Sequence, residues 1–273
     1  MAYPDPNLSK ARFVPPKGAC DIHCHVFGKG TPSPELDAER LFALHRHFGF
    51  DHAVIVEANE NARDVTVEAL AASGSRYRGI ARIKEATSDK ELEALHAVGV
   101  RGVRFTFVSH LGGAPDLTFV RRVLDQIRPL GWHVTFLIDP PDLLINLGLM
   151  QAIRTNFVID HMGRGQTADG LDAPGFKALV ELMKRDNAWV KVSGPDRISS
   201  KGPPFADAVP FAQALIAAAP DRVLWGTDWP HPTNKWQPND SELVDLIPVI
   251  APDAATRQKL LVDNPARLYG FTD

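Results

Sequence analysis

Three short segments of the chain bring histidine and aspartate together in a spacing that suits hydrolysis. Residues 23–25 read His23-Cys24-His25, His161 follows an apolar run, and Asp228 lies in the segment GTDWPH. Three imidazoles and a carboxylate could bind a zinc ion that acidifies a water molecule. Alternatively, the imidazoles could donate hydrogen bonds to a carbonyl group while Asp228 takes a proton from an attacking water. The spacing leaves both chemistries open.

These residues need a fold that gathers them, and the apolar pattern supplies one. Eight short β-branched or apolar runs begin near residues 20, 53, 79, 101, 133, 157, 189 and 222, with helix-like stretches between them. This alternation predicts an α/β fold with a single (β/α)8 TIM barrel over residues 1–273, and an open doubly wound sheet is the weaker alternative. We also expect an extended, proline-rich N-terminal arm at residues 4–16 and an extra C-terminal helix after Asn264-Pro265.

A barrel would place these polar residues at its mouth, because active sites lie at the C-terminal ends of barrel strands. Strict alternation along the first strand places Asp21, His23 and His25 on one face. The same rule turns His161 inward together with Phe157 and Ile159. We expect His45, His47, His52 and His96, which lie in predicted helices or at strand starts, to be structural or exposed.

Composition excludes several other classes of protein. The formal net charge is -3, with 44% hydrophobic and 23% charged residues and no long run of like charges, so we expect no nucleic-acid or membrane partner. The first fifteen residues lack the apolar core of a signal peptide, and we expect a cytoplasmic protein. Cys20 and Cys24 would lie about 13 Å apart on one strand, too far apart for a disulfide bond, and are expected to be buried, reduced thiols.

Several motifs together carry a resemblance to a known family. They are GACDIHCHVFG, GVRGVRF, VIDHMGR, the Ser-Gly-Pro-Asp-Arg stretch at residues 193–197, DRVLWGTDWPHP and the terminal NPARLYGF. The sequence resembles the amidohydrolase superfamily and, within it, the branch of 2-pyrone-4,6-dicarboxylate lactonases, over residues 12–271. The resemblance implies that Asp228 is the general base for water, while His23, His25 and His161 hold the lactone carbonyl.

The resemblance also bears on the cofactor. Zinc members of the superfamily add a histidine at the end of strand five and a lysine or carboxylate at the end of strand four. Here the predicted fifth strand has His133 at its start, and the fourth ends in Thr106-Phe107. We therefore expect no metal and no other cofactor, with zinc held by His23, His25, His161 and Asp228 as the alternative.

Three arginines, Arg104, Arg164 and Arg197, match substrate-binding positions of these lactonases. Arginine binds carboxylates through two parallel hydrogen bonds, so arginines that converge on one mouth predict an anionic substrate. The chain departs from the family pattern at His110, where an arginine is usual, and at Leu137, where a tyrosine is usual, and its loop after the first strand is shortened. Further candidate substrate contacts are Asn59, Lys84, His110 and His231.

We therefore expect a metal-independent lactonase, a carboxylic ester hydrolase that opens the ring of a small carboxylated lactone in aromatic or sugar-acid catabolism. A 2-pyrone-4,6-dicarboxylate-like, a muconolactone-like or a sugar-acid lactone would fit. The alternatives are a zinc-dependent amidohydrolase or decarboxylase, a lactone isomerase, or a barrel that only binds a carboxylated ligand. The sequence makes no prediction of the oligomeric state.

Overall fold

The structure is a computed structural model that describes residues 9–272 except 30, 32, 60 and 232–235. Its centre is one sheet of eight parallel strands in the order β1 to β8. The strands are β1 (Cys20–Cys24), β2 (His52–Val56), β3 (Tyr77–Ala81), β4 (Val100–Thr106), β5 (His133–Leu137), β6 (Phe157–Ile159), β7 (Ala188–Lys191) and β8 (Val223–Leu224). Each begins within two residues of its predicted start, so the predicted strand order is confirmed.

The sheet curls until its first and last strands meet, which makes it a nearly closed barrel. Backbone hydrogen bonds cross this seam from Ile22 N to Trp225 O at 3.1 Å, from His25 N to Trp229 O at 2.8 Å and from Asp228 N to His23 O at 2.7 Å. These bonds form just where β8 has ended as a regular strand. The seam therefore fixes the segment that carries Asp228 directly against the segment that carries the first two histidines.

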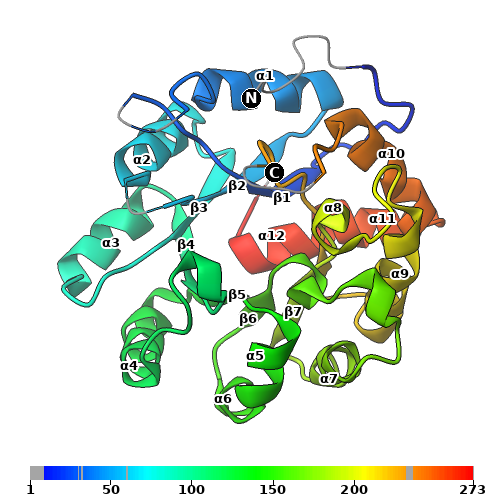
Figure 1. The fold of residues 1–273 in the computed structure, drawn as a ribbon. Coiled ribbons are helices and arrows are strands. Elements are labelled where there is room, and N and C mark those ends of the chain that lie inside the picture. The colour runs from blue at the N-terminus through cyan, green and yellow to red at the C-terminus, as the bar shows by residue number, and fades with distance from the viewer. Residues whose placement is uncertain (1–8, 30, 32, 60, 232–235, 273) are drawn as a thin grey trace.

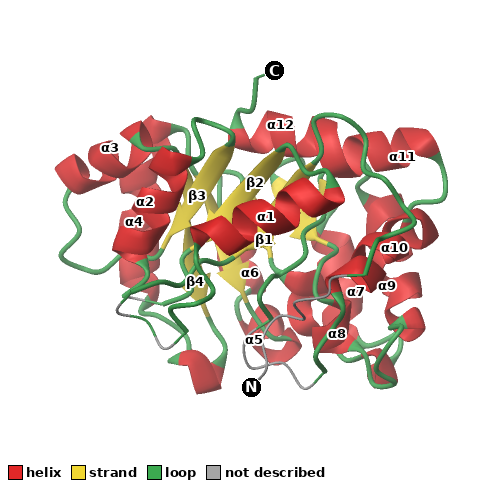
Figure 2. Cartoon of the chain, turned by 90° about the horizontal axis from the view of Figure 1, so that it is seen from above, coloured by secondary structure: helices red, strands yellow, loops and turns green. Residues whose placement is uncertain are grey.

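Helices surround this barrel, as Figure 1 shows in a view along it and Figure 2 from the side. They are α1 (Ala38–Phe48), α2 (Arg63–Ala72), α3 (Asp89–Ala97), α4 (Leu117–Ile127), α5 (Pro140–Ile145), α6 (Leu147–Ala152), α7 (Pro174–Leu182), α8 (Pro195–Ile198), α9 (Val209–Ala218), α10 (Asp240–Ile250), α11 (Ala254–Gln258) and α12 (Asn264–Tyr269). Several begin at a side-chain cap, such as Asp116, which accepts a hydrogen bond from Thr118 N at 2.7 Å.

The inside of the barrel is filled by a small apolar cluster separate from the larger layer between strands and helices. Its members include Ile22, Val56, Val158 and Trp189, and Tyr269 of α12 packs into the same cluster. The predicted C-terminal helix is therefore confirmed, and it covers the N-terminal end of the barrel (Figure 2). The opposite end, at the C-termini of the strands, remains for the polar residues.

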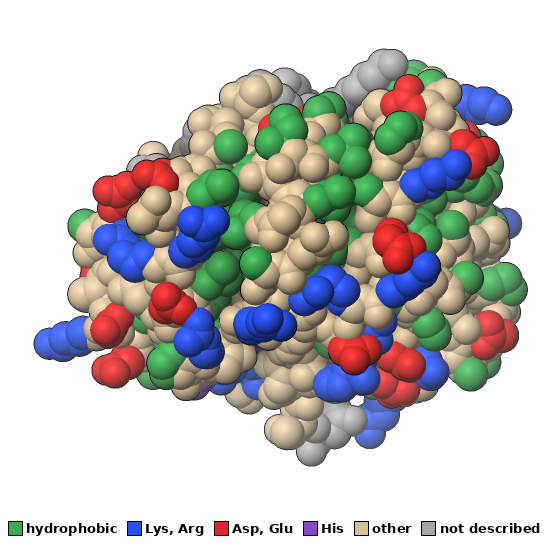
Figure 3. Space-filling view, turned by 90° about the horizontal axis from the view of Figure 1, so that it is seen from below, with side chains coloured by type: hydrophobic (Ala, Val, Ile, Leu, Met, Phe, Trp, Pro, Cys, Tyr) green, Lys and Arg blue, Asp and Glu red, His purple; other side chains and the backbone are tan. Residues whose placement is uncertain are grey.

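The arm before β1 docks on the outside of the barrel. The backbone N–H groups of Arg12 and Phe13 donate to Asp245 Oδ1 of α10 at 2.7 and 2.8 Å. Residues 4–8 of the predicted arm lie outside the described residues. Among the helices that are described, none is long and apolar enough to cross a membrane. On the face shown in Figure 3, basic and acidic side chains are interspersed, in keeping with the balanced charge.

The seam depends on a glycine, which gives a test of barrel closure. A Cβ atom at Gly226 would lie 2.5 Å from His23 N and 2.7 Å from Asp21 Oδ1, whereas a Cβ at Gly148, in α6, would meet no atom within 4 Å. We expect Gly226→Ala to lower the free energy of unfolding by about 1–3 kcal/mol, the usual cost of overpacking. Gly148→Ala should leave it unchanged or raise it by about 0.5–1 kcal/mol. Urea unfolding measures both, and equal effects of the two variants would contradict this account of the seam.

Candidate active site

The structure brings the four predicted catalytic residues together at the barrel mouth. His23 and His25 come from the end of β1, His161 follows β6, and Asp228 follows β8. The Nε2 atoms of the three histidines lie 3.6, 3.4 and 3.9 Å from Asp228 Oδ1, in that order. All four side chains are buried. One carboxylate oxygen is therefore the point on which three imidazoles converge.

The backbone reaches this arrangement through irregularities that strict alternation does not predict. The register between β1 and β2 shifts between Asp21 and Cys24, which turns Asp21 away from the histidines. Its carboxylate lies 3.2 Å from His45 Nε2 of α1 and accepts a hydrogen bond from Thr227 Oγ1 at 2.6 Å. The expectation that Asp21 shares a face with His23 is therefore wrong. His45 is structural, as expected.

A second irregularity follows β6. Phe157 and Ile159 belong to the layer that packs against the helices, while Val158 faces the barrel interior, so the expected inward direction of that pair is wrong. His161 still reaches the mouth because its φ is +48°, and Asp228 has a φ of +66°. Non-glycine residues seldom adopt this left-handed conformation, and it is concentrated at functional sites.

A buried charge network lies directly beneath the histidines. Lys191 Nζ of β7 lies 2.9 Å from Asp160 Oδ1, and Arg104 Nε of β4 donates to Asp160 Oδ2 at 2.9 Å. Burial acts to raise the pKa of Asp160, but Lys191 and Arg104 outweigh it and lower this pKa to about 2. Asp160 is therefore ionised, and its charge favours the ammonium form of Lys191 against the burial that lowers the lysine pKa.

Lys191 also fixes the position of a proton on His23. Its Nζ lies 3.1 Å from His23 Nδ1. An ammonium group can only donate, so Nδ1 accepts and the ring proton of neutral His23 is on Nε2. Burial, followed by Lys191, holds the pKa of His23 well below its usual value, which keeps the ring neutral. His23 therefore presents an N–H group toward Asp228.

His25 has the opposite arrangement. Its Nδ1 lies 2.7 Å from the carbonyl oxygen of Val56, which can only accept, so Nδ1 carries a proton. In the neutral ring, Nε2 then presents a lone pair. The Nδ1 atoms of His23 and His25 therefore differ, because Nδ1 of His23 accepts a hydrogen bond and Nδ1 of His25 carries a proton.

The two carboxylate oxygens of Asp228 have different surroundings. Arg197 donates to Oδ2 from Nε at 2.6 Å, and its Nη2 lies 2.5 Å from the same oxygen. Burial acts to raise the pKa of Asp228, but Arg197 and the histidines hold this pKa well below its usual range. Among the described residues, neither Asp228 Oδ1 nor His23 Nε2 has a hydrogen-bond partner. An acceptor and a donor thus face each other 3.6 Å apart, both with unused hydrogen-bonding capacity.

The predicted substrate-binding arginines all have carboxylate partners within the chain. Arg104 pairs with Asp160, Arg197 with Asp228, and Arg164 Nε lies 2.5 Å from Asp139 Oδ1. An inward arginine needs an anionic partner, and here protein groups supply one. Because each arginine already has a carboxylate partner in the protein, the presence of arginines around the mouth does not by itself predict a charged substrate.

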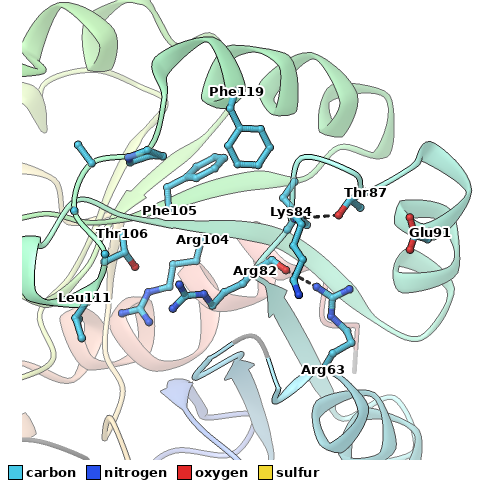
Figure 4. Close-up of a pocket in the computed structure, with 15 residues that line it drawn as sticks. Arg63, Arg82, Lys84, Thr87, Glu91, Arg104, Phe105, Thr106, Leu111 and Phe119 are labelled. Carbon is cyan, nitrogen blue, oxygen red and sulfur yellow. Dashed lines mark hydrogen bonds between the residues drawn. The ribbon is translucent and has the colours of Figure 1, made fainter.

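Of the remaining predicted contacts, His231 lies beside Asp228, because ligand atoms of Asp196, Asp228 and His231 lie within 4.8 Å of one another. Asn59 Oδ1 accepts from Asn61 N at 2.9 Å, which is a loop interaction, and His231 Nε2 lies 2.8 Å from Asp240 Oδ1. Lys84 lines a cavity beside Arg104 (Figure 4). His110 lies in a short turn at Ser109–Leu111, and its side chain is outside the described residues.

Sequence reasoning missed Lys191 and Asp160 as members of the site. Both are fully buried, and both belong to apolar runs, AWVKVSG and NFVIDHMG. A charged residue within such a run is itself a signal, because a buried charge needs a partner. Lys191 alternates with the inward Trp189, which could have marked its side chain as facing the barrel interior.

Several sets of ligand atoms are close enough to hold a metal ion. One set consists of His23, His25 and Asp228, whose ligand atoms lie within 4.8 Å of one another. The protonation pattern fits such an ion poorly, because a ligating His23 Nε2 must be bare, while Lys191 donates to Nδ1 and places the ring proton on Nε2. Arg197 already occupies the other oxygen of Asp228.

Comparison with known proteins identifies the class. The amidohydrolase family model matches residues 20–271, so the chain belongs to the amidohydrolase family. It is 42% identical to a 2-pyrone-4,6-dicarboxylate hydrolase from Comamonas testosteroni over 96% of this chain and 93% of that protein. It is also 41% identical to a 4-sulfomuconolactone hydrolase from Rhizobium radiobacter, over 94% and 92% of the two chains.

Two further relatives extend the comparison. A D-galactarolactone isomerase from Agrobacterium fabrum is 32% identical, over 93% of this chain and 91% of that protein. A crystal structure of a protein from Agrobacterium tumefaciens has a TM-score of 0.83 and 32% identity, with 95% of this chain and 98% of that chain covered. The curated relatives are thus lactone hydrolases and a lactone isomerase by name, and the solved structure shares the fold of this chain.

Buried neutral histidines make stability depend on pH. Burial lowers the pKa of His133 and of His161 to about 3. The unfolded chain binds a proton at each position below about pH 6.5, and the folded chain does not, so stability falls as pH decreases from 6.5 toward 3. Each residue should contribute a slope of up to about 1.4 kcal/mol per pH unit.

Urea unfolding between pH 7 and pH 4 measures this slope. His133→Gln is the informative variant because His133 is the first residue of β5, at the N-terminal end of the barrel and away from Asp228. Its slope should be smaller than that of the wild type by about one proton. A slope that His133→Gln leaves unchanged would show that His133 is protonated in the folded state.

Proposed function

We propose that this protein hydrolyses the ring ester of a small carboxylated lactone, with Asp228 as the general base. The observation that carries the proposal is the pair of facing atoms at the mouth, the oxygen of an ionised Asp228 and the N–H group of His23, each without a partner among the described residues. A water bound to Asp228 Oδ1 and, next to it, a carbonyl oxygen bound to His23 Nε2 would satisfy both. The hydrolases among the relatives act on lactones by name, which supports the same reaction class.

In this mechanism each polar group has a separate task. Asp228 Oδ1 accepts a proton as the water oxygen attacks the lactone carbonyl carbon, and His23 Nε2–H donates to the carbonyl oxygen as it becomes negative. His25 Nε2 accepts the second hydrogen of that water and so orients it. His161 would donate a second hydrogen bond to the carbonyl oxygen. The Ser193 hydroxyl lies 3.1 Å from His161 Nδ1 and can donate to it, which leaves the ring proton on Nε2.

The tetrahedral intermediate then collapses. The bond between the carbonyl carbon and the ring oxygen breaks, and the proton held by Asp228 passes to the leaving ring oxygen. The products are a carboxylic acid, which releases its proton to solvent and becomes a carboxylate, and a hydroxyl or enol group on the same open chain, and Asp228 returns to its ionised form. No metal takes part in these steps, and the donation from Lys191 to His23 Nδ1 supports a metal-independent reaction.

The arginines at the mouth would then recognise the carboxylate of the substrate. Arg164 is the best placed of the three, because its ion pair with Asp139 is partly exposed and can exchange partners. A second candidate function is lactone isomerisation, which the similarity to a D-galactarolactone isomerase favours. The same base and carbonyl donor would serve it, with a substrate hydroxyl in place of water.

The test is a screen of purified protein against 2-pyrone-4,6-dicarboxylate, muconolactone-type and sugar-acid lactones. Proton release reports hydrolysis, and NMR of the product separates ring opening from migration of the ester. We expect turnover of at least one carboxylated lactone, with full activity after chelation. Turnover of neutral lactones alone would refute the assigned substrate class, and a requirement for stoichiometric zinc would refute metal independence.

Asp228→Asn is the matched variant for this screen. It removes the base while it preserves shape, so kcat should fall by about 10²–10⁴-fold with a much smaller change in affinity for the product. Asp172→Asn, at an exposed carboxylate paired with Lys177, serves as the control and should retain wild-type kcat. Wild-type turnover by Asp228→Asn would remove Asp228 from the role of base.

A further inference from the structure

A buried carboxylate outside the four predicted catalytic residues, that of Asp21, holds the segment that carries the candidate base. Its Oδ1 accepts hydrogen bonds from His23 N at 3.1 Å and from Thr227 N at 3.0 Å. Its Oδ2 accepts from the Thr227 hydroxyl at 2.6 Å and lies 3.2 Å from His45 Nε2. Both oxygens are therefore used within the protein, and Asp21 joins β1 to the residue directly before Asp228.

The Thr227 hydroxyl continues this contact past the candidate base. While it donates to Asp21, its oxygen accepts a hydrogen bond from Trp229 N at 3.1 Å. Between these two bonds lies Asp228, whose own N–H group donates to His23 O at 2.7 Å. The backbone N–H groups of residues 227, 228 and 229 thus all have an acceptor. One side-chain oxygen spans the candidate base, from the residue before it to the residue after it.

This arrangement bears on the unusual backbone of Asp228. Its φ of +66° is left-handed, a conformation that costs free energy for a residue with a Cβ atom and persists only where surrounding contacts fix it. In this conformation Asp228 Oδ1 lies 3.6 Å from His23 Nε2 at the mouth. The Thr227 hydroxyl is one of the contacts that hold the segment. A change at Thr227 should therefore displace the Asp228 carboxylate without removing any atom of it.

The carboxylate of Asp21 is itself supported from the helix layer. His45 of α1 lies between Asp21 and Tyr77 of β3, whose hydroxyl is 2.6 Å from His45 Nδ1. Burial raises the pKa of Tyr77, so this hydroxyl keeps its hydrogen and can donate it to Nδ1, which leaves Nε2 to donate to Asp21. All three side chains are buried, and hydrogen bonds are stronger in such surroundings. A line of hydrogen bonds therefore runs from the Tyr77 hydroxyl to the Thr227 hydroxyl.

We propose that Thr227 is a positioning residue for the general base. Its hydroxyl, anchored on Asp21, holds Asp228 in the left-handed conformation that turns Oδ1 toward the mouth. Thr227 thus acts through Asp228 and not on the substrate. The assignment rests on the proposed function, because it takes Asp228 as the base. A positioning role predicts a loss of kcat with KM retained, since the substrate contacts stay in place while the base is displaced.

Matched substitutions of two buried threonines test this role. Thr227→Val keeps the shape of the side chain and removes the hydroxyl, so kcat for an accepted lactone should fall by about tenfold to a hundredfold, with KM changed by less than about twofold. Thr227→Ser restores the hydroxyl and should keep kcat within about threefold of the wild type. Thr66→Val, in α2, is the control and should retain wild-type kcat, because the buried Thr66 hydroxyl has no partner among the described residues.

A pair of tyrosines tests the other end of the line. Tyr77→Phe removes the hydroxyl that supports His45 and should lower kcat by about threefold or more, with KM retained. Tyr269→Phe removes a buried hydroxyl that has no hydrogen-bond partner in the described part of the chain, and it should leave kcat unchanged. If Thr227→Val fails to fold, this pair decides the question, and wild-type kcat in Tyr77→Phe then overturns the proposal.

Amide hydrogen exchange measures the position of the base without turnover. The N–H group of Asp228 donates to His23 O and not to Thr227, so its faster exchange in Thr227→Val would report that the backbone of the base has lost its position. Amides of β5 serve as the reference, because they report global unfolding. Relative to them, we expect exchange at Asp228 to accelerate by about tenfold or more in Thr227→Val, and not at all in Thr66→Val.

Three results would overturn the proposal: wild-type kcat in Thr227→Val, an equal loss of kcat in Thr227→Ser or Thr66→Val, or an unchanged relative exchange rate at Asp228 in Thr227→Val. A merely structural role would lower the free energy of unfolding of Thr227→Val and leave kcat per folded molecule unchanged. If the wild type opens no carboxylated lactone, the proposed function fails. The exchange rate at Asp228 then decides by itself whether Thr227 holds this residue in place.

Discussion

The buried ion pair between Lys191 and Asp160 is the interaction on which the candidate site depends. An ammonium group with no exposed surface is tolerated only when a carboxylate and further hydrogen bonds compensate its charge. Here the carboxylate of Asp160 binds both Lys191 and Arg104, and the ammonium group of Lys191 also donates a hydrogen bond to His23 Nδ1. Four strands, β1, β4, β6 and β7, are thereby joined beneath the mouth. Removal of either partner would leave a charge in the barrel interior, so the network constrains the structure as much as the chemistry.

From this constraint follows a simple division of labour around the mouth. Each candidate catalytic group has one polar atom committed to the protein and another left for substrate. His23 gives Nδ1 to Lys191, His25 gives Nδ1 to Val56, and Asp228 gives Oδ2 to Arg197. The open Nε2 atoms of His23 and His25 lie 3.6 and 3.4 Å from Oδ1, the open atom of Asp228. Groups held in this way need little reorganisation when charge develops in a transition state.

Much of this could be predicted from the sequence, and the failures have identifiable physical causes. The apolar runs predicted eight strands because fully buried parallel strands are nearly continuous in hydrophobicity. The rule that strand ends form the mouth then brought His23, His161 and Asp228 together. Alternation failed where the backbone departs from regular geometry, at the register shift after Asp21 and at the left-handed turn of His161. Lys191 escaped notice because its partner Asp160 is distant in sequence, and only the closed barrel shows that they meet.

The position of one proton tests the central claim most directly. Nitrogen NMR of protein labelled with ¹⁵N-histidine distinguishes a ring nitrogen that carries hydrogen from one that accepts a hydrogen bond, and loss of a signal in His23→Gln assigns it among the 10 histidines. The account predicts that at neutral pH His23 is uncharged, with hydrogen on Nε2 and none on Nδ1. A proton on His23 Nδ1, or a doubly protonated ring, would contradict it, because Lys191 could then no longer donate to that nitrogen and His23 would not be the oriented donor that faces Asp228.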